Sequence, residues 1–124
     1  MKYKILIVDD SRIARMQLKS IMTEENLSIS ECASGQEAIE KLQENYYHVV
    51  FLDLLMPGID GFGVLKYMKE NNINSTKVIV VTADIQAATK DEILSLGAFA
   101  FINKPPDKLS LRNILNKALE ESET

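Results

Sequence analysis

Short runs of apolar residues alternate with longer amphipathic stretches from one end of this 124-residue chain to the other. Four runs are almost continuously apolar, which is typical of strands buried on both faces of a parallel sheet. They occupy residues 5–8, 49–52, 78–81 and 98–102. A weaker segment at 28–33 alternates apolar with polar residues, so it is predicted to be an edge strand.

A segment with helical periodicity follows each predicted strand. The predicted helices span 11–24, 61–71, 85–96 and 107–121, and one more begins at Ser34. Ser34 and Glu37 form a capping-box pattern, and Asp107 is placed to cap the last helix. Five strands that alternate with five helices predict an α/β domain with a parallel sheet and right-handed crossovers.

The composition excludes several functions without defining one. The formal net charge is −4 and no basic run occurs, so direct binding of nucleic acid is not expected. The single cysteine, Cys32, excludes an internal disulfide and suits a reducing compartment. No apolar stretch is long enough for a signal peptide or a membrane span, which predicts a cytoplasmic protein without membrane insertion. The length suits one domain over residues 1–124, with no effector domain.

The histidine and several methionines are interpreted as structural. The chain has one histidine, His48, and without partner ligands it is predicted to have a structural role rather than a metal-binding or phosphodonor role. The methionines predicted to lie in or near the core are Met16, Met22, Met56 and Met68.

Polar residues directly follow four of the five predicted strands. These residues are Asp9 with Asp10, Asp53, Thr82, and Asn103 with Lys104. Because the strands of a parallel sheet point the same way, and ligands bind outside their carboxyl ends, these side chains are expected to converge on one edge. Each of them alone has an ordinary interpretation, such as a helix cap or a solvated turn, and the prediction depends on their combination.

The combined set suits one kind of chemistry. Clustered carboxylates repel one another and tolerate proximity around a cation. Hard oxygen ligands of this kind suit Mg²⁺ together with a phosphate oxygen. A carboxylate can also act as the nucleophile that forms an acyl phosphate, and a lysine and Mg²⁺ neutralise the charge of phosphoryl transfer.

Four short segments carry a resemblance to a known family. They are ILIVDDS at 5–11, DLLMPGIDG at 53–61, VTA at 81–83 and KP at 104–105. In order and spacing they resemble the signature segments of response regulator receiver domains of the CheY type, over essentially the whole chain. The resemblance implies a flavodoxin-like, doubly wound (βα)5 fold with a five-stranded parallel sheet in the order 2-1-3-4-5.

The resemblance also implies roles at the predicted edge. Asp53 is the implied phosphoacceptor, and Lys104 pairs with the phosphoryl oxygens. The implied ligands of Mg²⁺, for which Mn²⁺ can substitute, are Asp10 directly, Asp9 mainly through water, Asp53 itself and the backbone carbonyl of Leu55. Thr82 and the amide of Ala83 contact the phosphoryl group. The bond between Lys104 and Pro105 is expected to be cis.

A two-state output mechanism follows from the same resemblance. Thr82 moves toward the phosphoryl group, and Phe101, at a position where tyrosine is common in the family, turns inward. The simpler interpretation of Phe101 is a core residue. The implied contact surface for partners is formed by the helix at 85–96, the strand at 99–103 and the helix at 107–121.

Two positions depart from the best-known chemotaxis member of the family. Leu55 is apolar where that member has an asparagine, and Asp84 is shorter than the glutamate found there. Both flank the path of the hydrolytic water, so slower self-dephosphorylation is predicted, which makes an external phosphatase more useful.

The predicted function is that of a two-component response regulator, a phosphoacceptor that catalyses its own phosphorylation and dephosphorylation rather than an enzyme. Its predicted partners are a sensor histidine kinase, which supplies the phosphoryl group from a phosphohistidine, and a downstream protein target. Chemotaxis is the leading pathway, and a phosphorelay intermediate or another freestanding regulator is the alternative.

Other classes remain open. A haloacid dehalogenase-type phosphatase uses similar groups, but its nucleophile lies in an Asp-x-Asp motif after the first strand, where this chain has Asp9, Asp10 and Ser11. A flavodoxin-type cofactor module needs a phosphate-binding loop that the two acidic residues disfavour. A scaffold that works without phosphorylation is the third alternative, and the complete set of acidic residues, threonine and lysine argues against it.

Overall fold

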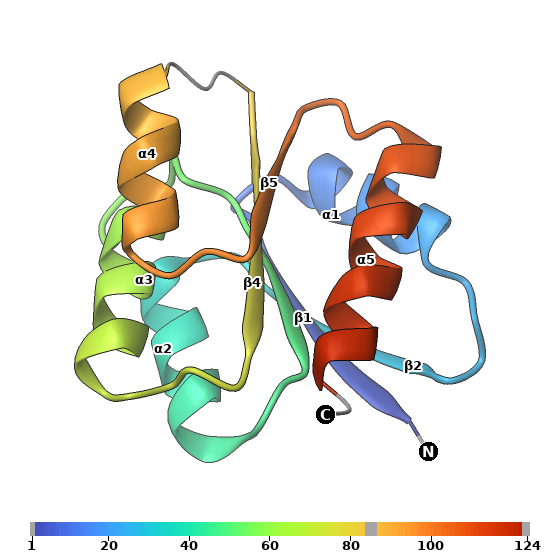
Figure 1. The fold of residues 1–124 in the computed structure, drawn as a ribbon, viewed down its shortest axis with the longest axis horizontal. Coiled ribbons are helices and arrows are strands. Elements are labelled where there is room, and N and C mark those ends of the chain that lie inside the picture. The colour runs from blue at the N-terminus through green and yellow to red at the C-terminus, as the bar shows by residue number, and fades with distance from the viewer. Residues whose placement is uncertain (1, 84–86, 123–124) are drawn as a thin grey trace.

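The structure is a computed structural model that describes residues 2–83 and 87–122, with residues 87–89 described by their backbone alone. Its strands are β1 (Tyr3–Val8), β2 (Leu27–Cys32), β3 (Val49–Leu52), β4 (Lys77–Thr82) and β5 (Ala100–Asn103). Its helices are α1 (Arg12–Ile21), α2 (Gly35–Glu44), α3 (Gly61–Glu70), α4 (Ala87–Ser95) and α5 (Lys108–Ser122). Strands and helices alternate along the chain as the sequence predicts (Figure 1).

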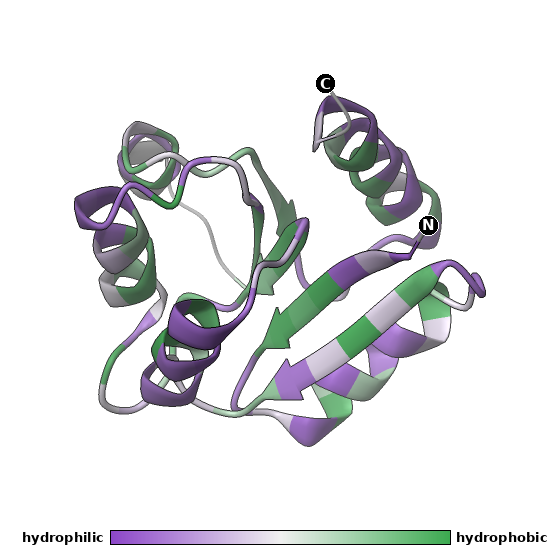
Figure 2. Ribbon diagram, turned by 90° about the horizontal axis from the view of Figure 1, so that it is seen from below, coloured by the Kyte–Doolittle hydropathy of each residue, from purple (hydrophilic) through white to green (hydrophobic). Residues whose placement is uncertain are grey.

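The strands form one parallel sheet in the order β2-β1-β3-β4-β5. Helices α2, α3 and α4 cover one face, and α1 and α5 cover the other (Figures 1 and 2). Alternate residues of the central strands supply the two cores, so Val8 and Leu52 face the first group of helices while Ile7 and Phe51 face the second. The flavodoxin-like, doubly wound fold is therefore confirmed. No helix of the described residues is long and apolar enough to cross a membrane.

The central strands and the edge strands differ in burial. Every residue of β3 is buried, as the continuous apolar run predicts. β5 is at the edge of the sheet, and its residues Ala100 and Phe101 are only half-buried, although the sequence pattern resembles that of the central strands. An edge strand has a sheet neighbour on one side only, which leaves part of its side-chain surface open. β2 lies at the other edge, as predicted.

Side-chain caps begin four of the helices and fix the connections above the sheet. Ser34 accepts a hydrogen bond from the backbone amide of Glu37 at 3.1 Å, and the carboxylate of Glu37 accepts one from the amide of Ala33. The return bond therefore comes from one residue earlier than in a standard capping box. Asp107 accepts a bond from the amide of Ser110 and caps α5 as predicted. Ser11 and Asp60 cap α1 and α3 in the same way.

Gly61 holds the start of α3 against the end of β3. Its amide donates to the carbonyl oxygen of Leu54 at 2.9 Å. A Cβ atom at this position would lie 2.5 Å from the carbonyl oxygen of Asp53, closer than real Cβ atoms approach such an oxygen. Only glycine permits this approach, and it brings α3 directly under the loop that begins at Asp53.

Candidate functional site

The carboxyl edge of the sheet brings together the polar residues that follow the strands. The backbone ladder continues past the ends of the strands: the amide of Asp53 donates to the carbonyl of Val8 at 2.9 Å, and the amide of Lys104 donates to the carbonyl of Thr82 at 2.7 Å. The amide of Asp9 donates to the carbonyl of Cys32 at 3.2 Å. The backbone at the start of each of these loops is thus an extension of the sheet.

Three carboxylates and one ammonium group meet at this edge. Ligand oxygen atoms of Asp9, Asp10 and Asp53 all lie within 4.8 Å of one another. Lys104 Nζ lies 2.7 Å from Oδ2 of Asp9 and 3.4 Å from Oδ1 of Asp53. Three carboxylates face one ammonium group, so the cluster has an excess of negative charge.

Burial sets this cluster apart from the acidic groups that are common on protein surfaces. Asp9 is 2% exposed and Asp53 is 5% exposed, whereas Asp10 is exposed. Burial raises the pKa of Asp53 above its ordinary value, the charge of Asp9 raises it further, and Lys104 and the backbone of Leu55 act in the opposite direction. Partial burial alone would lower the pKa of Lys104, but its bonds and charge interactions with Asp9 and Asp53 raise it overall, so this lysine remains an ammonium group.

The donor set fits a divalent cation of the hard kind. Closely spaced carboxylate oxygens, two of them on buried residues, are what Mg²⁺ and similar ions require from a protein, and a cation would offset the negative excess. Leu55, whose backbone carbonyl is the remaining predicted ligand, has an exposed side chain at the same loop. Its role as a ligand stays a prediction.

The other predicted site residues lie on or near the same edge. Thr82 is the last residue of β4, is 1% exposed and is paired with Asn103 of β5. Ala83 follows it and is exposed. The next predicted residue, Asp84, lies outside the described residues. The bond between Lys104 and Pro105 is cis, as predicted.

Phe101 is not part of the carboxylate cluster, and its side chain packs on the face of the sheet that α2, α3 and α4 cover. Its half-buried ring packs against the core beneath α4, and Lys90 Nζ lies 4.9 Å from the centre of the ring. The aromatic ring is therefore both a core residue and part of the surface between α4 and β5. The sequence left a switch residue and a core residue open as interpretations of Phe101. Its half-buried packing agrees with the second, and the inward turn on phosphorylation stays a prediction.

Two residues beside the site were not identified from the sequence. Arg15 donates to the backbone carbonyl of Asp9, and Glu31 of β2 binds Arg15. A basic residue on the helix that follows the acidic pair is a weak signal by itself. One partner of Arg15 follows β1 and the other lies on β2, so no local spacing reveals the pair of interactions.

The comparisons with known proteins agree with this geometry. The family model of the response regulator receiver domain matches residues 5–116. The chain is 37% identical to the transcriptional regulatory protein ResD of Bacillus subtilis over 111 residues, which are 88% of this chain and 45% of that protein. It is also 37% identical to the transcriptional regulatory protein SrrA of Staphylococcus aureus over 114 residues, 90% of this chain and 46% of that protein. The chain thus spans about half the length of these curated relatives.

Solved structures show the same fold over almost the whole chain. The receiver domain of the Francisella response regulator 1452 is 29% identical, with a TM-score of 0.86, and the match covers 98% of this chain and 99% of that one. A CheY-like receiver domain protein of Methanospirillum hungatei is 25% identical, with a TM-score of 0.90 and coverage of 99% and 98%. On the family match and these relatives, the chain belongs to the response regulator receiver domain family of two-component systems.

Proposed function

We propose that this receiver domain is a Mg²⁺-dependent phosphorylation switch in which Asp53 accepts a phosphoryl group from the phosphohistidine of a sensor histidine kinase. The observation that carries the proposal is the position of Asp53. Its buried carboxylate lies within 4.8 Å of those of Asp9 and Asp10, with Lys104 Nζ at 3.4 Å. A nucleophile, cation ligands and a fixed positive charge are the groups that phosphoryl transfer to a carboxylate requires.

The proposed reaction exchanges one phosphorus bond for another. An oxygen of Asp53 forms a bond to phosphorus while the bond between phosphorus and the donor imidazole nitrogen breaks, and that nitrogen keeps the electron pair and takes up a proton. Lys104 neutralises charge on the phosphoryl oxygens, and Thr82 and the amide of Ala83 donate hydrogen bonds to them. Mg²⁺ or Mn²⁺, held by the acidic residues and the carbonyl of Leu55, supplies further positive charge when bound.

The same residues serve the reverse half of the cycle, hydrolysis of the acyl phosphate, so the domain acts on itself and is not an enzyme with a separate substrate. The substitutions at Leu55 and Asp84 predict that this hydrolysis is slow. The exposed, apolar side chain of Leu55 supports that prediction because it offers no hydrogen bond to an attacking water. A separate phosphatase is accordingly a proposed partner.

The proposed output surface comprises α4, β5 and α5. Phe101 supports it, because its half-buried ring lies where this surface meets the core and contacts Lys90 of α4. Phosphorylation favours one arrangement of the surface only as far as the phosphoryl group binds that arrangement more tightly. A downstream protein is the proposed target.

The pathway stays a prediction. The sequence favours chemotaxis, with a phosphorelay step as the alternative. Two relatives at 37% identity are named as transcriptional regulatory proteins, and they extend well beyond the length that matches this chain. We propose that the domain signals by contact with another protein in a cytoplasmic two-component system. This proposal is the same for each of these pathways.

Intact mass spectrometry after incubation with acetyl phosphate and Mg²⁺ tests the proposed switch. We expect one phosphate adduct on the native chain, no adduct without Mg²⁺, and no adduct on Asp53→Asn. The matched control is Asp107→Asn, which changes an exposed aspartate that caps a helix, a position where asparagine also serves. It should be phosphorylated like the native chain. An adduct that persists on Asp53→Asn, or none on the folded native chain, would overturn the proposal.

A further inference from the structure

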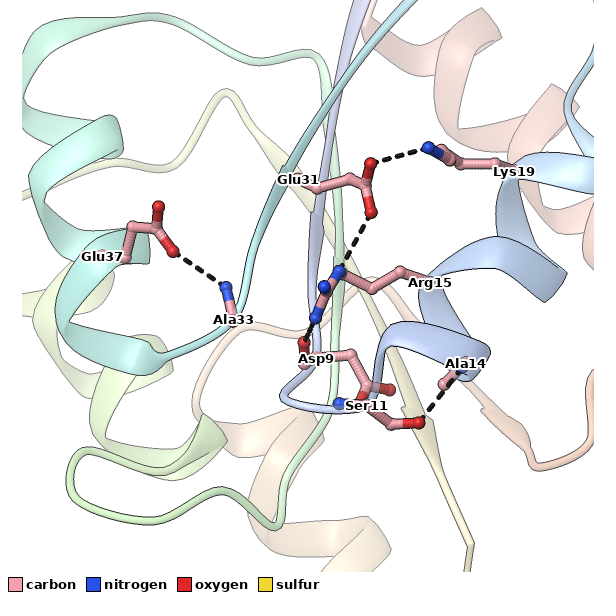
Figure 3. A network of polar contacts seen from close by, with 8 residues as sticks. All are labelled: Asp9, Ser11, Ala14, Arg15, Lys19, Glu31, Ala33 and Glu37. Atoms are coloured by element: carbon pink, nitrogen blue, oxygen red, sulfur yellow. Dashed lines mark hydrogen bonds and ion pairs between the residues drawn. The ribbon is translucent and has the colours of Figure 1, made fainter.

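A network of charged side chains lies beside the turn that carries Asp9 and Asp10 (Figure 3). Arg15 of α1 donates a hydrogen bond from Nη1 to the backbone carbonyl oxygen of Asp9 at 2.6 Å. Its Nε donates to Oε1 of Glu31 on β2 at 2.9 Å. The guanidinium group therefore joins the end of β1 to the neighbouring strand through two separate hydrogen bonds.

Partial burial and charge fix the orientation of this guanidinium. The side chain of Arg15 is 15% exposed and that of Glu31 is 32% exposed. The second oxygen of Glu31 lies 2.7 Å from Lys19 Nζ, so the carboxylate is held from both sides. The hydrogen bond from Lys19 is the largest influence on the pKa of Glu31 and lowers it; burial opposes this, and the bond and charge of Arg15 add to the lowering, so the pKa lies below its ordinary value. Glu31 thus remains a carboxylate that orients Arg15.

The contact with Arg15 completes the restraint of Asp9. One carboxylate oxygen of Asp9 accepts a hydrogen bond from the amide of Ser11 at 2.9 Å, and the other pairs with Lys104. The carbonyl bound by Arg15 belongs to the peptide group that joins Asp9 to Asp10. Because a peptide group is planar, fixing its oxygen also fixes the direction in which the next residue begins.

Asp10 depends on this restraint more than Asp9 does. Asp10 is exposed, whereas Asp9 is buried and bound through its side chain. An exposed carboxylate has little packing to hold it, so the backbone beneath it determines where its oxygens lie. A movement of the Asp9 carbonyl would therefore displace the Asp10 carboxylate from the other two.

We infer that Arg15, oriented by Glu31, is a positioning residue for the cation site: by binding the carbonyl of Asp9 it holds the turn from which Asp9 and Asp10 present their carboxylates to the ion. This inference rests on the proposed function, because it assigns Arg15 a task at the same site. Arg15 contacts a carbonyl rather than the reacting groups, so it acts through the position of other residues. Groups that orient metal ligands in this way typically change metal affinity about 10- to 100-fold when they are removed.

Mn²⁺ binding to the full chain is the direct test, with the free ion measured by electron paramagnetic resonance. We expect the dissociation constant for Mn²⁺ to rise about tenfold in Arg15→Met. Arg15→Lys should show a similar rise, because an ammonium group keeps the charge but cannot bridge a carbonyl and a carboxylate with a planar fork. Glu31→Gln, which keeps an acceptor for Arg15 but not its charge, should give a smaller rise.

Arg112 supplies the matched control because it makes the same kind of bridge at the other end of α1. Its Nη1 donates to the carbonyl of Ile21 at 3.1 Å and pairs with Glu24. Arg112→Met should therefore lose stability but bind Mn²⁺ like the native chain. Circular dichroism spectra establish that all variants are folded.

The outcomes separate positioning from charge and from general stability. Native-like Mn²⁺ affinity in both Arg15 variants would overturn the inference, and so would a native-like Arg15→Lys beside a weakened Arg15→Met, since charge alone would then account for the effect. Equal weakening in Arg112→Met would overturn it as well. Phosphorylation of the native chain by acetyl phosphate is scored separately, so failure of the proposed switch and failure of the Arg15 inference give different results.

Discussion

Buried polar side chains lie at both ends of the sheet, and the two groups differ in how they are satisfied. At the amino end, His48 precedes β3 and Thr76 precedes β4. At the carboxyl end, Asp9, Asp53 and Thr82 lie beyond or at the ends of the strands. Burial alone therefore does not distinguish a functional group from a structural one in this protein.

At the amino end, neutral groups are paired with the backbone. His48 Nδ1 accepts a hydrogen bond from the amide of Lys4 at 2.9 Å, and its ring makes T-shaped contacts with the rings of Tyr3 and Tyr46. The Thr76 hydroxyl donates to the carbonyl of Tyr47 at 2.7 Å. Burial lowers the pKa of His48, and the charge of Lys4 lowers it further, so the ring is neutral near physiological pH. The prediction of a structural histidine agrees with these contacts.

At the carboxyl end, like charges are held together instead. The carboxylates of Asp9 and Asp53 share one ammonium group, and the pKa of Asp53 is raised by burial and by Asp9. Such an arrangement costs stability in the absence of a cation and is retained where it serves binding or catalysis. Unbalanced buried charge, more than buried polarity, therefore distinguishes the candidate site from the amino end of the sheet.

The largest predicted difference between the two ends of the sheet is in the rate of phosphorylation, and it follows from removal of Lys104. In Lys104→Met no ammonium group opposes the carboxylates or the incoming phosphoryl group, so the rate of phosphorylation by acetyl phosphate should fall about 100-fold. His48→Gln, at the other end of the sheet, should leave this rate unchanged. The rate is measured from the growth of the phosphate adduct by mass spectrometry. A Lys104→Met chain that reacts at the native rate would show that this lysine takes no part in the reaction.

Substitutions at the two ends of the sheet should change the free energy of unfolding in opposite directions. In metal-free buffer, Asp53→Asn should raise the free energy of unfolding by about 1 kcal/mol, because it removes one of two buried like charges. Thr76→Val should lower it by about 1–2 kcal/mol, because the carbonyl of Tyr47 loses its donor. Urea denaturation in the presence of a chelator measures both. Destabilisation of similar size in the two variants would show that the two ends of the sheet do not differ in this respect.

The smallest predicted effect is a pH dependence of stability that arises from His48 at the amino end of the sheet. The pKa of His48 is below 6.5 in the folded chain, whereas the unfolded chain keeps the ordinary value. Between these two values the unfolded chain binds more protons, so the free energy of unfolding should fall as the pH falls below 6.5. The difference between the native chain and His48→Gln, measured by urea denaturation at a series of pH values on either side of 6.5, isolates this contribution. A difference that does not change with pH would contradict the assignment.

The parts of the molecule that could be predicted are those that depend on local pattern. Continuous apolar runs identified the central strands, and the residues that follow them identified the acidic cluster and Lys104, because parallel strands end at one edge. The order of the strands came from the family resemblance and not from the pattern. The helix at 11–24 was predicted too long, since α1 ends at Ile21.

Interactions between distant elements could not be predicted in the same way. Met16 was expected in or near the core but is 55% exposed, because α1 turns that residue away from the sheet. The bridge from Arg15 to the end of β1 and to β2 depends on how α1 packs against these two strands. The spacing of the residues along the chain does not reveal that packing. The half-exposure of Phe101 likewise follows from the position of β5 at the edge.

The position of Lys104 determines how the candidate site is connected to the edge of the sheet. The carboxylates extend from β1 and β3, which have strands on both sides, whereas the lysine extends from β5, which is hydrogen-bonded to β4 alone. The buried carboxylates of Asp9 and Asp53 thus lie at the centre of the sheet, whereas Lys104 directly follows a strand at its edge. Under the proposed function, a charge added at Asp53 would reach the edge of the molecule through Lys104 and β5, a single edge strand that another protein can contact.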